Sequence, residues 1–178
     1  MRRWFRCRTG KRELVAIGAA IGAGCQPCTQ YHVGVALKAG LTRDEVSSAI
    51  DGAQAVRREG GIAVSNVGRR ILGVEGEQAE RLGEPREREQ ALVYIGAAVG
   101  CNAGGLLTGY MATAGERFGL SLEELRSAVE TAGFVKQRAA DFLRRDVERA
   151  LGQTEEAVVV TGSASEGGGT GGCCGPTS

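Results

Sequence analysis

The chain contains an internal repeat, and this feature limits its possible folds more than any other. The string IGAA at positions 17–20 recurs at positions 95–98, an offset of 78 residues. Further along, GLTRDEVSSAI beginning at Gly40 is echoed by GLSLEELRSAV beginning at Gly119, an offset of 79 residues. One residue has therefore been inserted between the two matches in the second half. We interpret the chain as two tandem copies of about 75 residues each.

The repeat and the composition divide the chain into three parts. The first copy covers residues 1–82 and the second covers residues 83–152, with the junction in the polar segment EGEQAERLGEPRERE. Beyond about Leu151 the helical pattern stops, and the stretch TGSASEGGGTGGCCGPTS has no core-forming residues besides its cysteines. We therefore predict that residues 153–178 form a flexible tail rich in Gly and Ser.

Both copies carry helix signals at matching places. Thr42 and Ser121 are each followed three residues later by Glu, which is the pattern of a capping box at a helix start. Two residues before each of them is a Gly, suited to the left-handed residue that ends a preceding helix. Each copy therefore reads as helix, Gly break, helix, capped turn and long helix. Aromatic residues make up only 4% of the chain, and a core of small aliphatic side chains fits close helix packing, so we predict an all-α fold.

Composition excludes several classes of protein. The 22 basic and 21 acidic residues give a net charge of +1, which offers no case for nucleic-acid binding. The sequence has no run of 18 apolar residues, so we expect no membrane-spanning helix. The Arg-rich start, an apolar run and Cys25 imitate a lipoprotein signal, but IGAA also occurs deep inside the chain, where no signal peptide can lie. Six unevenly spaced cysteines favour thiol chemistry or metal binding in a reducing compartment, and we expect a cytoplasmic protein.

The segment AGCQPCTQYH carries the strongest chemical signal. Cys25 and Cys28 form a C-x-x-C pair, and Pro27 is favoured in a first helical turn, so we expect a helix to begin around Gln26. In that first turn, unpaired N–H groups and the helix dipole favour the thiolate of Cys28. A spacing of four residues places His32 on the same helix face as Cys28. Two thiols and an imidazole in this arrangement are typical of a dithiol redox site.

Two other interpretations of the cysteine pair stay open. A zinc site could use Cys25, Cys28 and His32, although structural zinc prefers a fourth ligand and none is obvious nearby. The pair could also be two buried structural thiols. Haem attachment is excluded, because it needs a His directly after the second Cys and Thr29 is there instead.

Residues 13–46 resemble the carboxymuconolactone decarboxylase and alkylhydroperoxidase AhpD-like family. The signature of that family is Glu, eleven residues, C-x-x-C, three residues and His, and here Glu13 completes it. Glu13 alone would be interpreted as a solvated residue of a first helical turn. The resemblance implies a peroxidatic thiolate at Cys28, a resolving thiol at Cys25, and a proton relay formed by His32 and Glu13.

The resemblance also implies a helical bundle that assembles as trimers or hexamers and reduces peroxides. We expect a protein that reduces organic or hydrogen peroxide without a cofactor, using electrons from a small thiol or a protein dithiol. Because one chain contains two copies, a trimer of such chains could contain the same six repeats as a hexamer of single-copy chains. The alternatives are a non-catalytic thiol sensor or soft-metal-binding module on the same fold, and a decarboxylase-type lyase.

The second copy lacks the signature. At the offset of 78, the four site positions hold Ala91, Ala103, Leu106 and Tyr110. A gapped alignment could place Cys101 on Cys25 and Glu89 on Glu13, but a base and a second thiol would still be missing. We therefore predict a structural second copy in which Cys101 is a small buried apolar residue.

The remaining cysteines lie near the two ends of the chain. Cys173 and Cys174 are adjacent, and neighbouring Cα atoms are about 3.8 Å apart, closer than disulfide geometry prefers. We consider this pair a candidate soft-metal site, a reductant for the first-copy disulfide, or an incidental part of the tail. We assign no role to Cys7.

Overall fold

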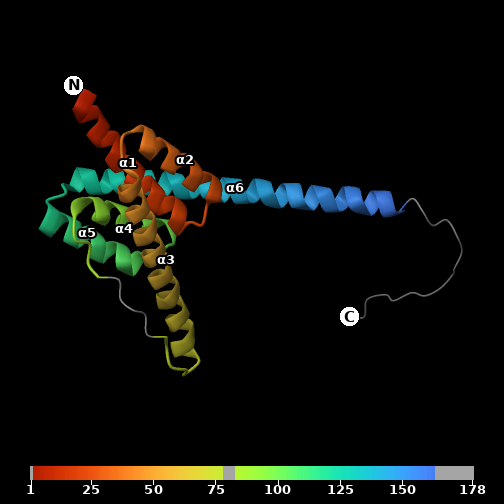
Figure 1. Cartoon of the computed structure of the whole chain (residues 1–178). Coiled ribbons are helices and arrows are strands. Elements are labelled where there is room, and N and C mark those ends of the chain that lie inside the picture. Colours follow the sequence, from red (N-terminus) through yellow and green to blue (C-terminus); the bar gives the residue numbers. More distant parts are fainter. Residues whose placement is uncertain (1, 78–82, 163–178) are drawn as a thin grey trace, which may run out of the picture. The chain divides into compact units, whose positions relative to one another are not determined.

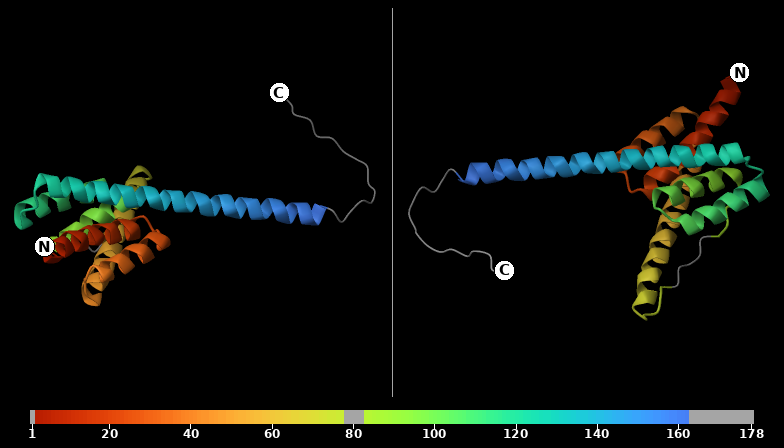
Figure 2. Two further views of the ribbon diagram at one scale, coloured as in Figure 1. Left: turned by 90° about the horizontal axis from the view of Figure 1, so that it is seen from above. Right: turned by 180° about the vertical axis from the view of Figure 1, so that it is seen from behind.

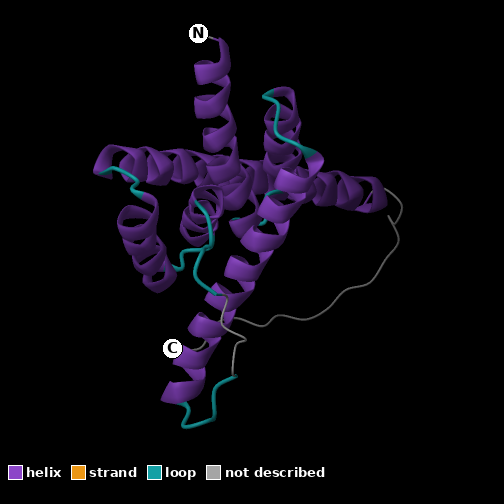
Figure 3. Ribbon diagram, turned by 60° about the vertical axis from the view of Figure 1, so that its left-hand side comes forward, coloured by secondary structure: helices purple, strands orange, loops and turns teal. Residues whose placement is uncertain are grey.

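The computed structural model describes residues 2–77 and 83–162, and side chains within residues 10–77 and 83–152. The described part is all-helical, as predicted (Figures 1 and 3). The helices, in chain order, are α1 (Arg2–Gly22), α2 (Gln26–Lys38), α3 (Arg43–Ile71), α4 (Arg88–Gly100), α5 (Gly104–Phe118) and α6 (Leu122–Gly162). The chain divides into two units, residues 1–142 and residues 143–178, which are described separately.

Helices α1 and α4 form the centre of the first unit. Their segments 14–21 and 91–98 carry small or apolar side chains on all faces, and these residues are buried. A helix that is apolar all round belongs inside a protein, surrounded by other helices. Helices α2 and α3 pack against α1, α5 packs against α4, and α3 also contacts α4, as the two views of Figure 2 allow the reader to follow.

Glycines let α1 and α4 approach at backbone distance. A β-carbon on Gly18 or Gly22 of α1 would lie well under 3.0 Å from a backbone carbonyl oxygen of α4, at Val93 or Ala97. A residue with a side chain could not occupy these positions without moving the helices apart. The small residues of the IGAA strings therefore determine how closely the two central helices pack.

The close approach is reciprocal. Gly96 and Gly100 of α4 face the carbonyl oxygens of Val15 and Ala19 of α1 in the same way that Gly18 and Gly22 face α4. Each contact is reproduced on the other helix at the offset of 78 residues. We propose, on this ground, that the two halves of the first unit are copies related by an internal two-fold arrangement.

The helix ends follow the predicted signals. Helix α2 begins at Gln26 as expected, and Thr42 caps α3 by accepting a hydrogen bond from the Glu45 N–H at 3.2 Å. The Glu45 carboxylate accepts in turn from the Thr42 N–H at 2.7 Å, which completes the capping box. The matching box at Ser121 has the same two reciprocal bonds to Glu124. Both predicted capping boxes are therefore confirmed.

The second unit contains the end of α6, which differs from the predicted tail. The helix continues to Gly162, past the expected end of helical structure near Leu151. Between Gly152 and Gly162 the sequence has no Gly or Pro, so nothing there interrupts a helix except the modest cost of Gly152 itself, about 1 kcal/mol. The adjacent cysteines Cys173 and Cys174 lie outside the described residues.

Within the described residues, no helix combines the length and the apolar character that crossing a bilayer requires.

Candidate dithiol site

The candidate site begins at the tight turn between α1 and α2. The last turn of α1 ends with hydrogen bonds from the Gly24 N–H to the Ile21 carbonyl oxygen at 3.0 Å and from the Cys25 N–H to the Ala20 carbonyl oxygen at 2.9 Å. Gly24 has a φ of +71°, a left-handed conformation that Gly adopts without strain. This turn reverses the chain and places Cys25 at the start of α2.

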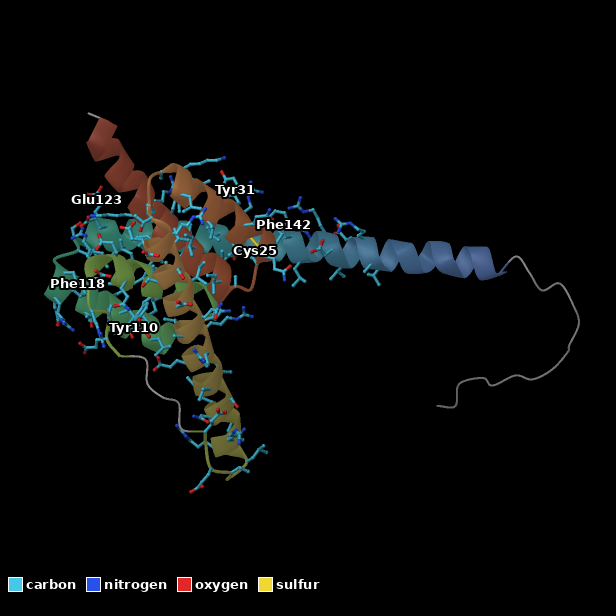
Figure 4. The ribbon with its side chains drawn as sticks, in the orientation of Figure 1. Cys25, Tyr31, Tyr110, Phe118, Glu123 and Phe142 are labelled. Atoms are coloured by element: carbon cyan, nitrogen blue, oxygen red, sulfur yellow. A yellow bond between two sulfur atoms is a disulfide. The ribbon has the colours of Figure 1, made fainter. Side chains whose placement is uncertain are left out.

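Cys25 is the N-cap residue of α2. Its Sγ accepts a hydrogen bond from the Cys28 N–H at 3.2 Å, and Pro27 occupies the first turn. Cys25 and Cys28 are joined by a disulfide, with Cα atoms 5.3 Å apart, and both are buried (Figure 4). An N-cap normally uses a side-chain oxygen for this bond, and here sulfur takes that place. In the reduced form the same N–H would stabilise a Cys25 thiolate.

Glu13 and His32 form a largely buried pair that joins α1 to α2. Glu13 Oε2 lies 2.8 Å from His32 Nδ1, and the two side chains are 11% and 16% exposed. A buried carboxylate is costly unless it is paired, and this contact provides the partner. When Nδ1 carries the proton and donates to the carboxylate, Nε2 is left to exchange a proton with another group. Cys28 precedes His32 by four residues on α2, a spacing that places both on one face of that helix.

The position of Glu13 differs from its interpretation as an isolated residue. Because α1 begins at Arg2, Glu13 lies in the middle of that helix and not in a solvated first turn. Among the described residues, Glu13 is the only charged side chain that is buried in the core. Neither helical periodicity nor a capping pattern marks it, and the family resemblance supplied the signal.

Two residues near the site were missed by sequence reasoning. Tyr31 is 66% exposed, and its ring meets the ring of His32 edge-on with centroids 5.1 Å apart. Arg57 of α3 donates from Nη1 to the Ile21 carbonyl oxygen at 3.1 Å, in the turn that leads to Cys25. The match of Arg57 with Lys136 at the repeat offset of 79 is the one signal that singles out either residue.

The corresponding positions of the second half hold no dithiol. Ala91 and Ala103 are buried, and Tyr110 stands where His32 does in the first half. The Tyr110 hydroxyl is buried and faces Glu59 without reaching full hydrogen-bond geometry. Burial first, and then the charge of Glu59, raises the pKa of Tyr110. His32 is the only histidine of the chain, so no second Glu–His pair exists.

Cys101 is half-buried at the end of α4, so it is less enclosed than predicted. Burial raises the pKa of its thiol above the ordinary value, against the smaller opposing effects of neighbouring N–H groups and of Arg57 and Lys136. A thiol with a raised pKa is mostly protonated at neutral pH and reacts slowly. The raised pKa therefore disfavours the thiolate form of Cys101.

A separate cavity of about 390 Å³ lies between α1, the α2–α3 turn and the first turns of α3 and α4. Its apolar lining includes Leu14, Leu41 and Val93, and none of the four candidate site residues lines it. Within the described residues, no group of three His, Cys, Asp or Glu side chains is placed to hold a metal ion. The prediction of soft-metal binding at Cys173 and Cys174 lies outside those residues.

Residues 9–64 match the model of the carboxymuconolactone decarboxylase family. The matched segment contains Glu13, the cysteine pair, His32 and Arg57, and it ends within α3. No curated protein and no solved structure matches the chain.

Proposed function

The chain belongs, through residues 9–64, to the carboxymuconolactone decarboxylase family, and from that premise we propose that it is a dithiol peroxidase. It would reduce organic or hydrogen peroxide by cycling Cys25 and Cys28 between dithiol and disulfide. The observation that carries this proposal is the bonded cysteine pair at the start of α2, with His32 one turn along that helix and held by Glu13 of α1.

The first step uses the thiolate of Cys28. Its sulfur attacks one peroxide oxygen, the O–O bond breaks, and the second oxygen leaves as an alcohol or water after taking a proton from His32. Cys28 becomes a sulfenic acid, so the sulfur has given up two electrons to the peroxide. Glu13 supports the step by holding the ring of His32 through its Nδ1 atom.

The second step closes the disulfide. The Cys25 thiolate, favoured by the Cys28 N–H, attacks the Cys28 sulfur, and the sulfenic hydroxyl leaves as water after taking a proton. Two thiols of an external donor then exchange with the disulfide, are oxidised to a disulfide themselves, and restore both cysteines. The donor would be a small thiol or a protein dithiol, as a reducing compartment such as the cytoplasm provides.

The test is turnover of cumene hydroperoxide or t-butyl hydroperoxide with dithiothreitol as donor. We expect turnover by the wild-type chain, none by Cys28→Ser, and wild-type turnover by the matched control Cys101→Ser. Activity that survives Cys28→Ser intact would contradict the proposal, as would no activity at all in a folded protein. Formation of the Cys25–Cys28 disulfide by oxidant without turnover would instead support a thiol sensor.

The proposal extends to assembly and to the family's other reaction. We propose a homotrimer, in which three two-copy chains supply six helical repeats. Light scattering that gives the mass of one 18.5 kDa chain would contradict this. The decarboxylase reaction remains the alternative activity, and its test is turnover of a small lactone acid by the Cys28→Ser variant.

A further inference from the structure

Arg57 reaches from α3 to the turn that precedes the cysteine pair. Its Nη1 donates to the Ile21 carbonyl oxygen at 3.1 Å, which also accepts the Gly24 N–H at 3.0 Å. The guanidinium also covers Gly24, because a β-carbon built on Gly24 would lie 3.0–3.3 Å from its atoms. Residues 21–24 are therefore held from outside by a side chain that belongs to another helix.

The contact is favourable for electrostatic reasons as well. Ile21 lies in the last turn of α1, where carbonyl groups lack helix partners and the helix dipole is negative. A guanidinium at that end provides both a hydrogen-bond donor and an opposite charge. Next along the chain comes Cys25, so the held turn and the N-cap of α2 are continuous.

The second half contains the same contact without a dithiol. Lys136 donates from Nζ to the Val99 carbonyl oxygen at 3.2 Å and also contacts the side chain of Asn102. Lys136 corresponds to Arg57 at the offset of 79, and Val99 corresponds to Ile21 at 78. Asn102, with a φ of +60°, corresponds to Gly24. A lysine can thus make this contact, and the second half provides an internal comparison.

We propose that Arg57 is a positioning residue for the dithiol: by holding residues 21–24 it keeps Cys25 at the N-cap of α2, with its sulfur placed to bond Cys28. The inference rests on the dithiol chemistry proposed above, but it concerns the disulfide and not the peroxide. Without the contact the turn samples more conformations, and the two sulfurs meet less often. The disulfide then becomes easier to reduce, because the effective concentration of the Cys25 thiol near Cys28 falls.

The experiment measures the glutathione equilibrium of the full chain. In this equilibrium the protein disulfide and two glutathione molecules give the protein dithiol and one glutathione disulfide, and alkylation with mass spectrometry reports the ratio at Cys25 and Cys28. For Arg57→Met we expect the equilibrium to shift toward the dithiol by about tenfold. For Arg57→Lys we expect a value within about twofold of wild type, since Lys136 makes the same contact in the second half.

Two control variants separate positioning from general stability. Arg58→Met removes the exposed neighbouring guanidinium and should leave the equilibrium unchanged. Lys136→Met removes the matching contact of the second half, so it should lower the midpoint of urea unfolding while leaving the dithiol equilibrium unchanged. A shift by Lys136→Met equal to that of Arg57→Met would overturn the proposal, because the effect would then be global.

The remaining outcomes also decide. A glutathione equilibrium of Arg57→Met within twofold of wild type overturns the proposal. An equally large shift in Arg57→Lys overturns it too. If Arg57→Met does not fold, Arg57→Gln replaces it with the same expected shift. The glutathione equilibrium of Cys25 and Cys28 can be measured whether or not the protein turns over peroxide. The proposed function and the role of Arg57 can therefore fail separately.

Discussion

Gly18 and Gly96 occupy corresponding positions at the crossing of α1 and α4, and each faces a backbone carbonyl oxygen of the opposite helix, at Val93 and Val15. We expect Gly18→Ala to destabilise the protein by about 3 kcal/mol or more, because the added methyl group meets a backbone that cannot move without separating two central helices. The midpoint and slope of urea unfolding would measure this loss.

Gly109→Ala is the matched control for the crossing. Gly109 lies in α5, and a β-carbon there would have nothing within 4 Å. The same substitution should therefore stabilise the protein by up to about 1 kcal/mol, since Ala has the higher helix propensity. Equal unfolding midpoints for Gly18→Ala and Gly109→Ala would contradict the close crossing.

The Glu13–His32 pair predicts that the proposed peroxidase reaction slows when the carboxylate is removed. In Glu13→Gln an amide replaces the carboxylate that holds the His32 ring. We expect kcat/KM for cumene hydroperoxide to fall by about 10²-fold, within the range typical of general acid–base groups. The disulfide should still form with a strong oxidant, because the two sulfurs do not depend on Glu13 for their position.

Glu89→Gln provides the comparison in the second half. Glu89 lies in the first turn of α4, and a gapped alignment pairs it with Glu13, but no histidine is there to be its partner. Its substitution should leave kcat/KM within about twofold of wild type. A loss equal to that of Glu13→Gln would show that the relay has been assigned to the wrong half.

The fold could be predicted from sequence wherever the signal is local. The capping residues Thr42 and Ser121 and the C-x-x-C segment determine helix starts through bonds to residues three positions away, and the structure has all three starts. The repeat then predicted that the second half would follow the helix order of the first. The end of α6 was misplaced, because a Gly-rich sequence further along was interpreted as ending the helix too early.

The site could be predicted only in part, because several of its contacts join distant segments. The pairing of Glu13 with His32 spans 19 residues, and the contact of Arg57 with Ile21 spans 36. No local pattern marks such pairs, so the first came from a family resemblance and the second from the structure. The approach of the buried Tyr110 hydroxyl to Glu59 of α3 is a contact of the same kind.

The capping boxes predict a dependence of stability on pH. Hydrogen bonds from the Thr42 backbone and side chain lower the pKa of Glu45 below its ordinary value of 4.5. A carboxylate whose pKa is lower in the folded protein stabilises the fold above its unfolded pKa, and this contribution is lost as the pH falls through the folded value. The difference in unfolding free energy between wild type and Glu45→Gln should therefore be present at pH 7 and shrink below about pH 4.

Thr42→Ala tests the other half of the same box. Loss of the hydroxyl leaves the Glu45 N–H without its cap, and we expect a cost of about 1 kcal/mol at pH 7. Ser121→Ala should cost a similar amount, since its hydroxyl accepts from the Glu124 N–H at the same 3.2 Å. Thermal unfolding of both variants at pH 7 would measure the costs, and no loss in either would contradict the capping geometry.

Tyr94 and Tyr110 predict opposite results for the same substitution. Their rings meet edge-on at 5.1 Å and both are buried, but the Tyr94 hydroxyl accepts a hydrogen bond from Gln90 at 3.0 Å, while the Tyr110 hydroxyl faces Glu59 without reaching full hydrogen-bond geometry. Tyr94→Phe should cost about 1 kcal/mol, because it removes that bond. Tyr110→Phe should leave stability unchanged or raise it by up to about 1 kcal/mol, since it removes a desolvated hydroxyl whose approach to Glu59 falls short of hydrogen-bond geometry. Urea unfolding of the two variants measures the difference, and a greater loss for Tyr110→Phe would mean that its hydroxyl has a partner in solution.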